Sequence, residues 1–201
     1  MITARGPESS GRSNVGKTSM MREVVGRGYE TGKRPGVTLE PNQYDWSAES
    51  FAVTDMPGFG FMSGVDEERQ EEVRDSIVEY LEKHSDRILV AVHVIDANSF
   101  VDIVDRWEER DEVPHDVDLH GLLHDLEIPT VVAVNKIDKV EDRDERLDAV
   151  VDRLGYPPPW KQWDDVFAPV NAKQGNVEPL FSVVRDELER QNRHDLLKFF
   201  S

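Results

Sequence analysis

The 201-residue chain contains no cysteine, which excludes disulfide bonds and metal sites built on thiolates. It also has no apolar run of about 18 residues and no basic stretch leading into an apolar one at its start. From these absences we expect a cytoplasmic protein with no membrane partner. The length suffices for a sizeable core, and we expect residues 1–201 to form a single domain.

Basic residues are scarce: 24 Lys and Arg face 41 Asp and Glu, for a net charge of −17. The acidic residues are spread along the chain, which favours a halophilic protein adapted to a salt-rich cytoplasm over an ordinary acidic surface. A chain of this charge is a poor partner for nucleic-acid phosphates, so we expect no DNA binding. Residues 1–34 are the exception, with seven Lys and Arg against three Asp and Glu.

Apolar runs alternate with amphipathic stretches, a pattern typical of an α/β fold in three layers. We expect a mostly parallel central sheet of about six strands, with helices on both faces. The expected strands include 51–55, 87–96, 129–135 and 166–170, and the expected helices are 17–25, 66–84, 115–126, 141–154 and 177–191. In such folds ligands bind at the carboxyl ends of the strands.

The segment GRSNVGKT, from Gly11 to Thr18, matches the pattern G-x-x-x-x-G-K-[ST]. Its glycines let successive backbone N–H groups face one anion, and the following helix adds its positive end. Lys17 would reach the β- and γ-phosphates as a catalytic cation, and the Thr18 hydroxyl would bind Mg²⁺. A plain glycine-rich turn is the alternative. The expected phosphate contacts are Gly11, Arg12, Ser13, Asn14, Val15, Gly16, Lys17, Thr18 and Ser19.

Two more segments would complete the phosphate and metal site. Asp55, at the end of an expected strand, would hold Mg²⁺ through water, and the Gly58 N–H would contact a γ-phosphate as part of catalysis. Thr38 would complete the Mg²⁺ shell and also act in catalysis. The residues concerned are Asp55, Met56, Pro57 and Gly58 in one segment and Pro35, Gly36, Val37 and Thr38 in the other. Taken alone, DMPG is also an ordinary strand-to-turn sequence.

The segments NKID and NAK follow the last two expected strands. The Asp138 carboxylate would accept hydrogen bonds from guanine N1–H and the 2-amino group, neither of which adenine offers, so an ATPase is disfavoured. Asn135 would tie its loop to the phosphate loop, and the Lys136 stem would cover the base. A charged strand exit is the plain alternative. The expected base contacts are Asn135, Lys136, Ile137 and Asp138, with backbone groups of Asn171, Ala172 and Lys173 at guanine O6.

With GRSNVGKT, PGVT, DMPGFG and NKIDK in this order, the chain resembles the translation-factor-like P-loop GTPases and, within them, the EngB group. The resemblance covers nearly the whole chain. It implies GTP and GDP binding, GTP hydrolysis with Mg²⁺, and a switch role in assembly of the large ribosomal subunit. A GTP-dependent docking module with negligible turnover is the second interpretation.

The chain departs from this pattern at several places. Phe59 follows DMPG where Ras-like enzymes have a Gln that orients water, so we expect slow intrinsic turnover. Asn14 would either coordinate K⁺ beside the phosphates, as in potassium-activated relatives, or only shape the loop. Residues 99–127 are longer than usual. Within them His120 and His124 lie four residues apart, on one face of an expected helix. A zinc site would need a third ligand, so we expect a polar helix face instead.

The segment before the phosphate loop, RGPESS, is too polar for a buried strand. We expect a short, polar strand that still occupies the centre of the sheet. Alternatively, residues 1–4 supply the strand with a bulge, or the true residues before the loop differ from those in the sequence.

Overall fold

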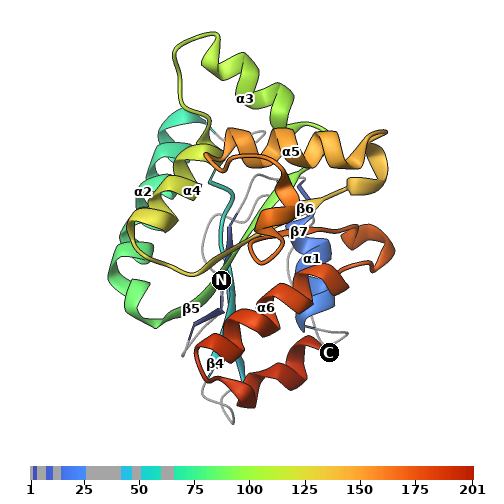
Figure 1. The fold of residues 1–201 in the computed structure, drawn as a ribbon. Helices are drawn as coiled ribbons and strands as arrows, with labels where there is room; N and C mark the ends of the chain where they lie inside the picture. Colours follow the sequence, from blue (N-terminus) through green and yellow to red (C-terminus); the bar gives the residue numbers. More distant parts are fainter. Residues whose placement is uncertain (1, 4–7, 11–14, 26–41, 47–50, 60–65) are drawn as a thin grey trace.

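A central sheet with helices on both faces is the frame of the protein in the computed structural model (Figure 1). The structure describes residues 2–3, 8–10, 15–25, 42–46, 51–59 and 66–201. This arrangement confirms the predicted three-layer α/β fold. Within the described residues, no helix combines the length and the apolar character needed to cross a bilayer.

The described strands form a seven-stranded sheet, against about six expected. Between β4 and β5 lie both β1 and β2, while β6 and β7 extend the sheet beyond β5, and β3 pairs with β4. Strands β2, β4, β5, β6 and β7 are parallel, whereas β1 and β3 run antiparallel to their neighbours. The strand bounds are β1 Ile2–Thr3, β2 Glu8–Ser10, β3 Asn42–Trp46, β4 Phe51–Asp55, β5 Ile88–Asp96, β6 Thr130–Asn135 and β7 Phe167–Pro169.

The polar segment Glu8–Ser10 occupies the central position of the sheet, as predicted. As β2 it pairs in parallel with β4, where Ser9 lies opposite Asp55, and with β5, where Ser10 lies opposite His93. Backbone pairing on both sides holds a strand even where its side chains contribute little apolar surface. The two residues of β1 lie between the same two strands but run the other way.

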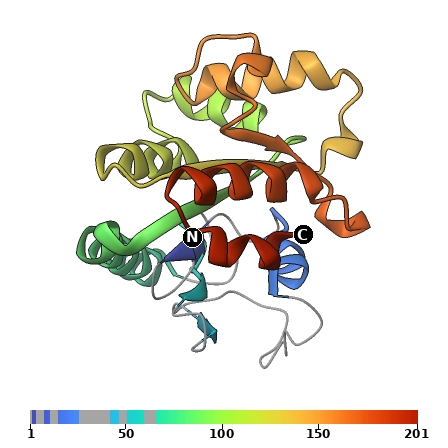
Figure 2. The same ribbon diagram turned by 60° about the horizontal axis from the view of Figure 1, so that its bottom comes forward.

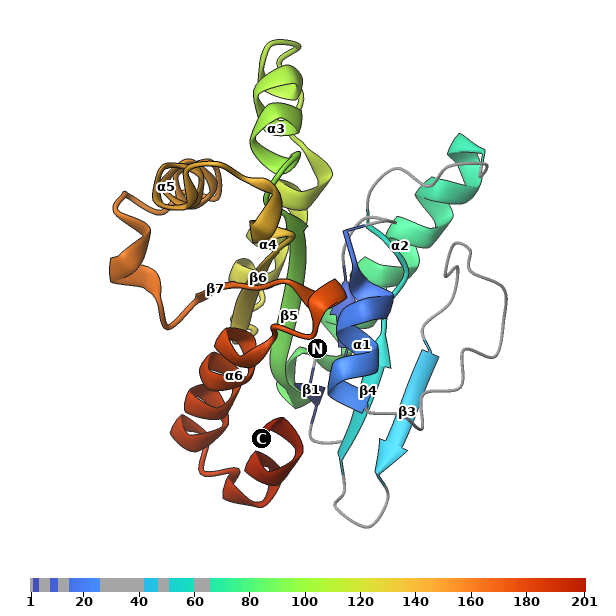
Figure 3. The ribbon, with the colours of Figure 1, turned by 90° about the vertical axis from the view of Figure 1, so that its right-hand side faces the viewer.

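Helices α1 (Lys17–Val25) and α6 (Glu178–Arg190) cover one face of the sheet, in front of the strands in Figure 3. Helices α2 (Glu67–His84), α3 (Phe100–Glu108), α4 (His115–Asp125) and α5 (Arg143–Arg153) cover the other. Because side chains alternate along a strand, Val131 and Ala133 of β6 pack toward α6, while Val132 and Val134 pack toward α5. The C-terminal segment η7 (His194–Phe200) folds back along α6 (Figure 2).

Residues 99–127, which the sequence did not place in full, form two helices with a turn between them. Helix α4 was expected, but α3 was not, although its residues Phe100, Val101 and Val104 lie on one face and are buried. The turn includes the exposed Val113, and Asp111 adopts a left-handed backbone with a φ of 55°.

The prediction that the histidines of α4 lie on a polar helix face is wrong for His120. His124 is exposed, but His120 is buried, its Nε2 lies 3.0 Å from the Tyr156 hydroxyl, and its ring stacks on His93. Burial, together with the neighbouring histidines, lowers the pKa of His120 from 6.5 to about 3. The imidazole is therefore neutral in the folded protein near neutral pH.

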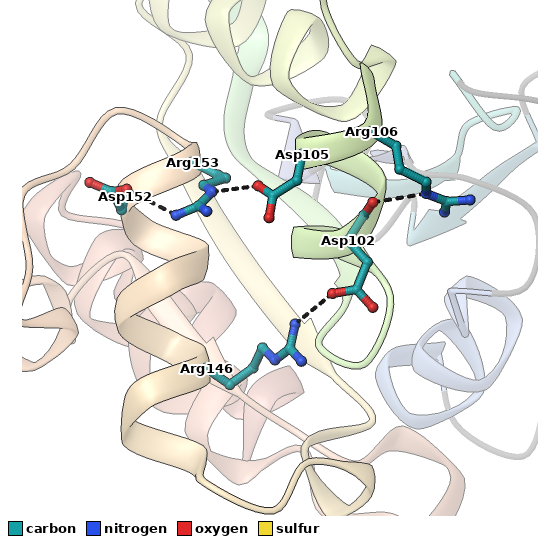
Figure 4. A network of polar contacts seen from close by, with 6 residues as sticks. All are labelled: Asp102, Asp105, Arg106, Arg146, Asp152 and Arg153. Carbon is teal, nitrogen blue, oxygen red and sulfur yellow. Dashed lines mark hydrogen bonds and ion pairs between the residues drawn. The ribbon is translucent and has the colours of Figure 1, made fainter. Parts of the chain in front are cut away.

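Ion pairs join α3 to α5 across the upper part of the molecule (Figure 4). The Arg153 Nε donates to Asp105 over 2.9 Å, and an Arg146 nitrogen lies 3.3 Å from an Asp102 oxygen. Arg106 instead donates to the Asp102 carbonyl within α3. The carboxylates are well exposed, so the pairs orient two already packed helices and add little to the free energy of unfolding.

Replacing Arg153 with Gln is therefore expected to lower the free energy of unfolding by less than about 1 kcal/mol in dilute buffer. The loss should shrink at molar salt, because mobile ions screen exposed pairs. Urea titrations at two salt concentrations measure both effects. Arg106→Gln, which leaves both interhelical pairs in place, is the matched control, and a loss of several kcal/mol that persists in salt would contradict this interpretation.

Candidate functional site

Several predicted site residues lie at one edge of the sheet, where its parallel strands end. Of the predicted residues, Asp55 ends β4 and Asn135 ends β6; Asp96, which was not predicted, ends β5 directly opposite Asn135 in the register. Helix α1 begins at Lys17 at the same edge. Polar side chains thus surround the place where the sequence predicts nucleotide phosphates and base.

Asn135 joins three loops of this edge and is only 3% exposed. Its Nδ2 donates to the carbonyl of Val15 over 2.7 Å, and its Oδ1 accepts the backbone N–H of Ala172 over 3.0 Å. Its own carbonyl accepts the N–H of Ala97 over 2.8 Å. One residue therefore fixes the loop before α1, the loop after β5 and the loop after β7 relative to one another, and both ends of its buried amide have a hydrogen-bond partner.

Only a glycine at position 16 lets the loop before α1 lie so close to the Asn135 amide. Its φ is 103°, in the region that favours glycine, and a Cβ added there would lie 2.2 Å from the Asn135 Nδ2. The amide cannot swing away without breaking both of its hydrogen bonds. The second glycine of GRSNVGKT is therefore a packing requirement as well as a backbone one.

Lys17 directs its ammonium group toward the end of β4, where Nζ donates to the Met56 carbonyl over 3.0 Å. Burial lowers the pKa of Lys17 to about 8, although the nearby carboxylates of Asp55 and Asp116 oppose this shift. An additional anion at this place would raise the pKa again, because it stabilises the charged form. The electrostatics of Lys17 thus suit a phosphate-binding position.

The residues predicted to bind the base lie beside the Asn135 amide. Lys136 has a left-handed backbone with a φ of 62°, and Asp138 follows in a short 3-10 turn with its side chain exposed. After β7, Asn171 is buried and its side chain accepts the Gln174 N–H, which closes the turn holding the exposed Lys173. The structure therefore leaves the carboxylate of Asp138 accessible to a ligand.

Part of the predicted site lies outside the described residues: Gly11, Arg12, Ser13, Asn14, Pro35, Gly36, Val37 and Thr38. Thr18 and Ser19 fall in the first turn of α1. Met56, Pro57 and Gly58 are buried directly after β4. Phe59 is 3% exposed and packs in the cluster formed by α2, α4 and the sheet.

Two acidic residues near this site were not predicted from the sequence. Asp96 forms an ion pair with Lys136, and Asp116, at the start of α4, is 4% exposed and acts electrostatically on Lys17. Both lie in segments without a motif, so only the register of β5 and β6 or the packing of α4 reveals them. An acidic residue at the end of a predicted buried strand was the available signal for Asp96.

The donor groups at this edge fit Mg²⁺ better than a transition metal. Asp55 offers a carboxylate that is 4% exposed, and Thr18 is a hydroxyl residue in the first turn of α1, so the candidate ligands among the described residues are oxygen atoms. Among the residues that the structure describes, no three His, Asp or Glu side chains are grouped closely enough to hold a metal ion.

A mostly parallel sheet whose central strand precedes GRSNVGKT and a helix in the chain, with NKID at the end of β6, defines a P-loop GTPase fold. The family described as "50S ribosome-binding GTPase" matches residues 10–136. The chain is 53% identical over 191 residues to the "Probable GTP-binding protein EngB" of Halorubrum lacusprofundi, covering 95% of this chain and 93% of that one. The protein of the same name from Haloquadratum walsbyi is 54% identical over 190 residues, covering 94% and 92%.

A crystal structure of a probable GTP-binding protein EngB superposes with a TM-score of 0.79 and 38% identity, covering 90% of this chain and 99% of that chain. The chain therefore belongs to the EngB family of GTP-binding proteins.

Proposed function

We propose that the protein binds GTP and GDP, hydrolyses GTP slowly and acts as a molecular switch in assembly of the large ribosomal subunit. The observation that supports the proposal is the Asn135 amide, which links Val15, in the candidate phosphate loop, to Ala172, in one candidate base loop, while Asn135 itself begins the other. A site assembled in this way contacts phosphates and base of one nucleotide at the same time.

Guanine selectivity would come from Asp138. Its exposed carboxylate accepts two hydrogen bonds from guanine and none from adenine, so adenine leaves it unsatisfied. The stem of Lys136 covers the face of the base, and backbone N–H groups of Asn171–Lys173 meet guanine O6. Asn171 replaces the serine usual in this family, which leaves a main-chain contact intact.

The phosphates would lie on the loop Gly11–Ser19, with Lys17 neutralising the β- and γ-phosphates and the Gly58 N–H contacting the γ-phosphate. Mg²⁺, held by Thr18, Thr38 and, through water, Asp55, would neutralise charge that develops on the phosphate oxygens. K⁺ beside Asn14 would add a second positive charge. The alternative role of Asn14 is to shape the loop without binding an ion.

Slow turnover follows from Phe59. Its ring packs under α2 and α4 and has no group that orients a water molecule for attack on the γ-phosphate. Hydrolysis would then depend on a partner or an ion, and the family description names the 50S ribosome as the partner class. The same observation supports the second candidate, a GTP-dependent docking module with negligible turnover.

Asp138→Asn tests the assignment of the base. Because an amide offers a donor where the carboxylate accepts, we expect GTP affinity to fall at least about 100-fold and xanthosine triphosphate affinity to rise. Calorimetric titration with both nucleotides measures the exchange of preference. Glu141→Gln, a nearby exposed residue, is the control and should bind GTP normally.

If Asp138→Asn keeps its guanine preference, the base assignment is wrong.

Single-turnover phosphate release with and without large ribosomal subunits separates the enzyme from the docking module. Release that the subunits accelerate supports the enzyme, and nucleotide-dependent co-sedimentation without release supports the module.

A further inference from the structure

The ion pair between Asp96 and Lys136 joins the end of β5 to the first residue after β6. Lys136 Nζ and Asp96 Oδ2 are 2.5 Å apart, and the side chains are only 25% and 13% exposed. Because water is largely excluded from both groups, the pair is less screened than the exposed pairs between α3 and α5. It is also a charge-assisted hydrogen bond, a stronger class of contact.

The Asp96 carboxylate is itself held in place. Its second oxygen, Oδ1, accepts the backbone N–H of Asn98 over 3.0 Å, and the Ala97 N–H donates to the Asn135 carbonyl over 2.8 Å. In the register of β5 and β6, Asp96 lies opposite Asn135. The carboxylate is therefore a rigid acceptor that presents one oxygen to its own turn and the other to Lys136.

Lys136 needs such an acceptor. A lysine side chain has four rotatable bonds, and ordering it costs more rotamer entropy than ordering most other side chains. The backbone of Lys136 is also left-handed, a conformation that is unfavourable for a non-glycine residue. Fixing Nζ on Asp96 orders the carbon stem before any ligand arrives, so a ligand covered by this stem binds without the entropic cost.

We infer that Asp96 is a positioning residue for nucleotide binding, which holds the stem of Lys136 in place to cover the guanine ring. The inference rests on the proposed function. Asp96 would thus contribute to nucleotide affinity together with the NKID segment, although it lies on a different strand and in none of the motifs. Asp96 itself need not touch the nucleotide.

The test is a double-mutant cycle on GDP affinity. Asp96→Asn keeps an acceptor for the Asn98 N–H but removes the charge that holds Lys136, and we expect the Kd for GDP to rise about five- to tenfold. Lys136→Met should weaken binding at least as much. In the Lys136→Met background, Asp96→Asn should cost nothing further, because the group it positions is gone.

Asp105→Asn is the matched control, since Asp105 also pairs with a cation, Arg153, but lies in α3 outside the site; its Kd should change less than twofold. Thermal unfolding of each variant verifies that it is folded. A purely structural role of Asp96 would weaken binding equally with and without Lys136, and that result, like an unchanged Kd in Asp96→Asn, would overturn the inference. A wild-type protein that fails to bind GDP would instead contradict the proposed function.

Discussion

Gly16→Ala is expected to lower the free energy of unfolding by about 3 kcal/mol or more and to weaken GDP binding at least about 100-fold. The added methyl would meet the Asn135 Nδ2 at 2.2 Å, at a residue whose φ of 103° already disfavours any side chain. The clash is relieved only if the Asn135 amide breaks its hydrogen bonds to the Val15 carbonyl and the Ala172 N–H. These two backbone groups would then remain buried without a partner. Urea denaturation and calorimetric GDP titration measure the two losses.

Gly155→Ala is the matched control for this substitution. Gly155 has a φ of 87°, but nothing lies within 4 Å of the position that an added methyl would occupy, so only backbone strain of about 1–2 kcal/mol is expected, with no change in GDP affinity. Similar losses in the two variants would show that contact with Asn135 is unimportant. Asn135→Ala in the Gly16→Ala background removes the clash but also the amide, so stability should recover in part while GDP affinity should not.

Acidification from pH 6.5 to 4.5 is expected to cost the protein about 2 kcal/mol of stability through His120 alone. Burial lowers the pKa of His120 from 6.5 to about 3, so between these values the unfolded chain binds a proton that the folded chain does not. The stabilising contribution is thus present above pH 6.5 and is lost as the pH falls toward 3. Protonation would place a charge against His93 and would leave Nε2 able only to donate to the Tyr156 hydroxyl.

His120→Gln tests the pH dependence, because it retains hydrogen-bonding capacity toward Tyr156 and does not titrate. Urea titrations at pH 7, 6, 5 and 4.5 measure the free energy of unfolding of wild type and variant. As the pH falls, the wild type should lose about 2 kcal/mol more of this free energy than the variant. Val113→Gln, an exchange at an exposed position away from His120, provides the control and should follow the wild-type curve. Parallel curves for wild type and His120→Gln would rule out this origin of the acid sensitivity.

The elements that the sequence predicted best are those whose local signals agree with their packing. The bounds of α1 and β4 match the predicted 17–25 and 51–55, and α2 begins one residue later than predicted because Asp66 is its N-cap. The NKID and GRSNVGKT segments were recognisable because their chemistry depends on residue type and spacing, which a sequence displays directly.

The features that the sequence missed depend on partners far along the chain. Strand β3 (NQYDW) is short and its apolar residues are two aromatics in alternation with polar residues, and it pairs along its whole length with β4. His120 is buried because it meets Tyr156, 36 residues away, and Asp96 meets Lys136 across 40 residues. A helical period shows which residues share a face, but it does not show which other element that face will meet.

The amide of Asn135 makes ligand binding and folding a single linked equilibrium. Each loop that it ties down belongs at once to the hydrophobic scaffold and to the proposed nucleotide site, so opening the site weakens the scaffold as well. A nucleotide present at 100 times its Kd would add about 2.7 kcal/mol to the stability of the folded chain. The nucleotide concentration would then set the fraction of the chain that is folded as well as the fraction of sites that are filled.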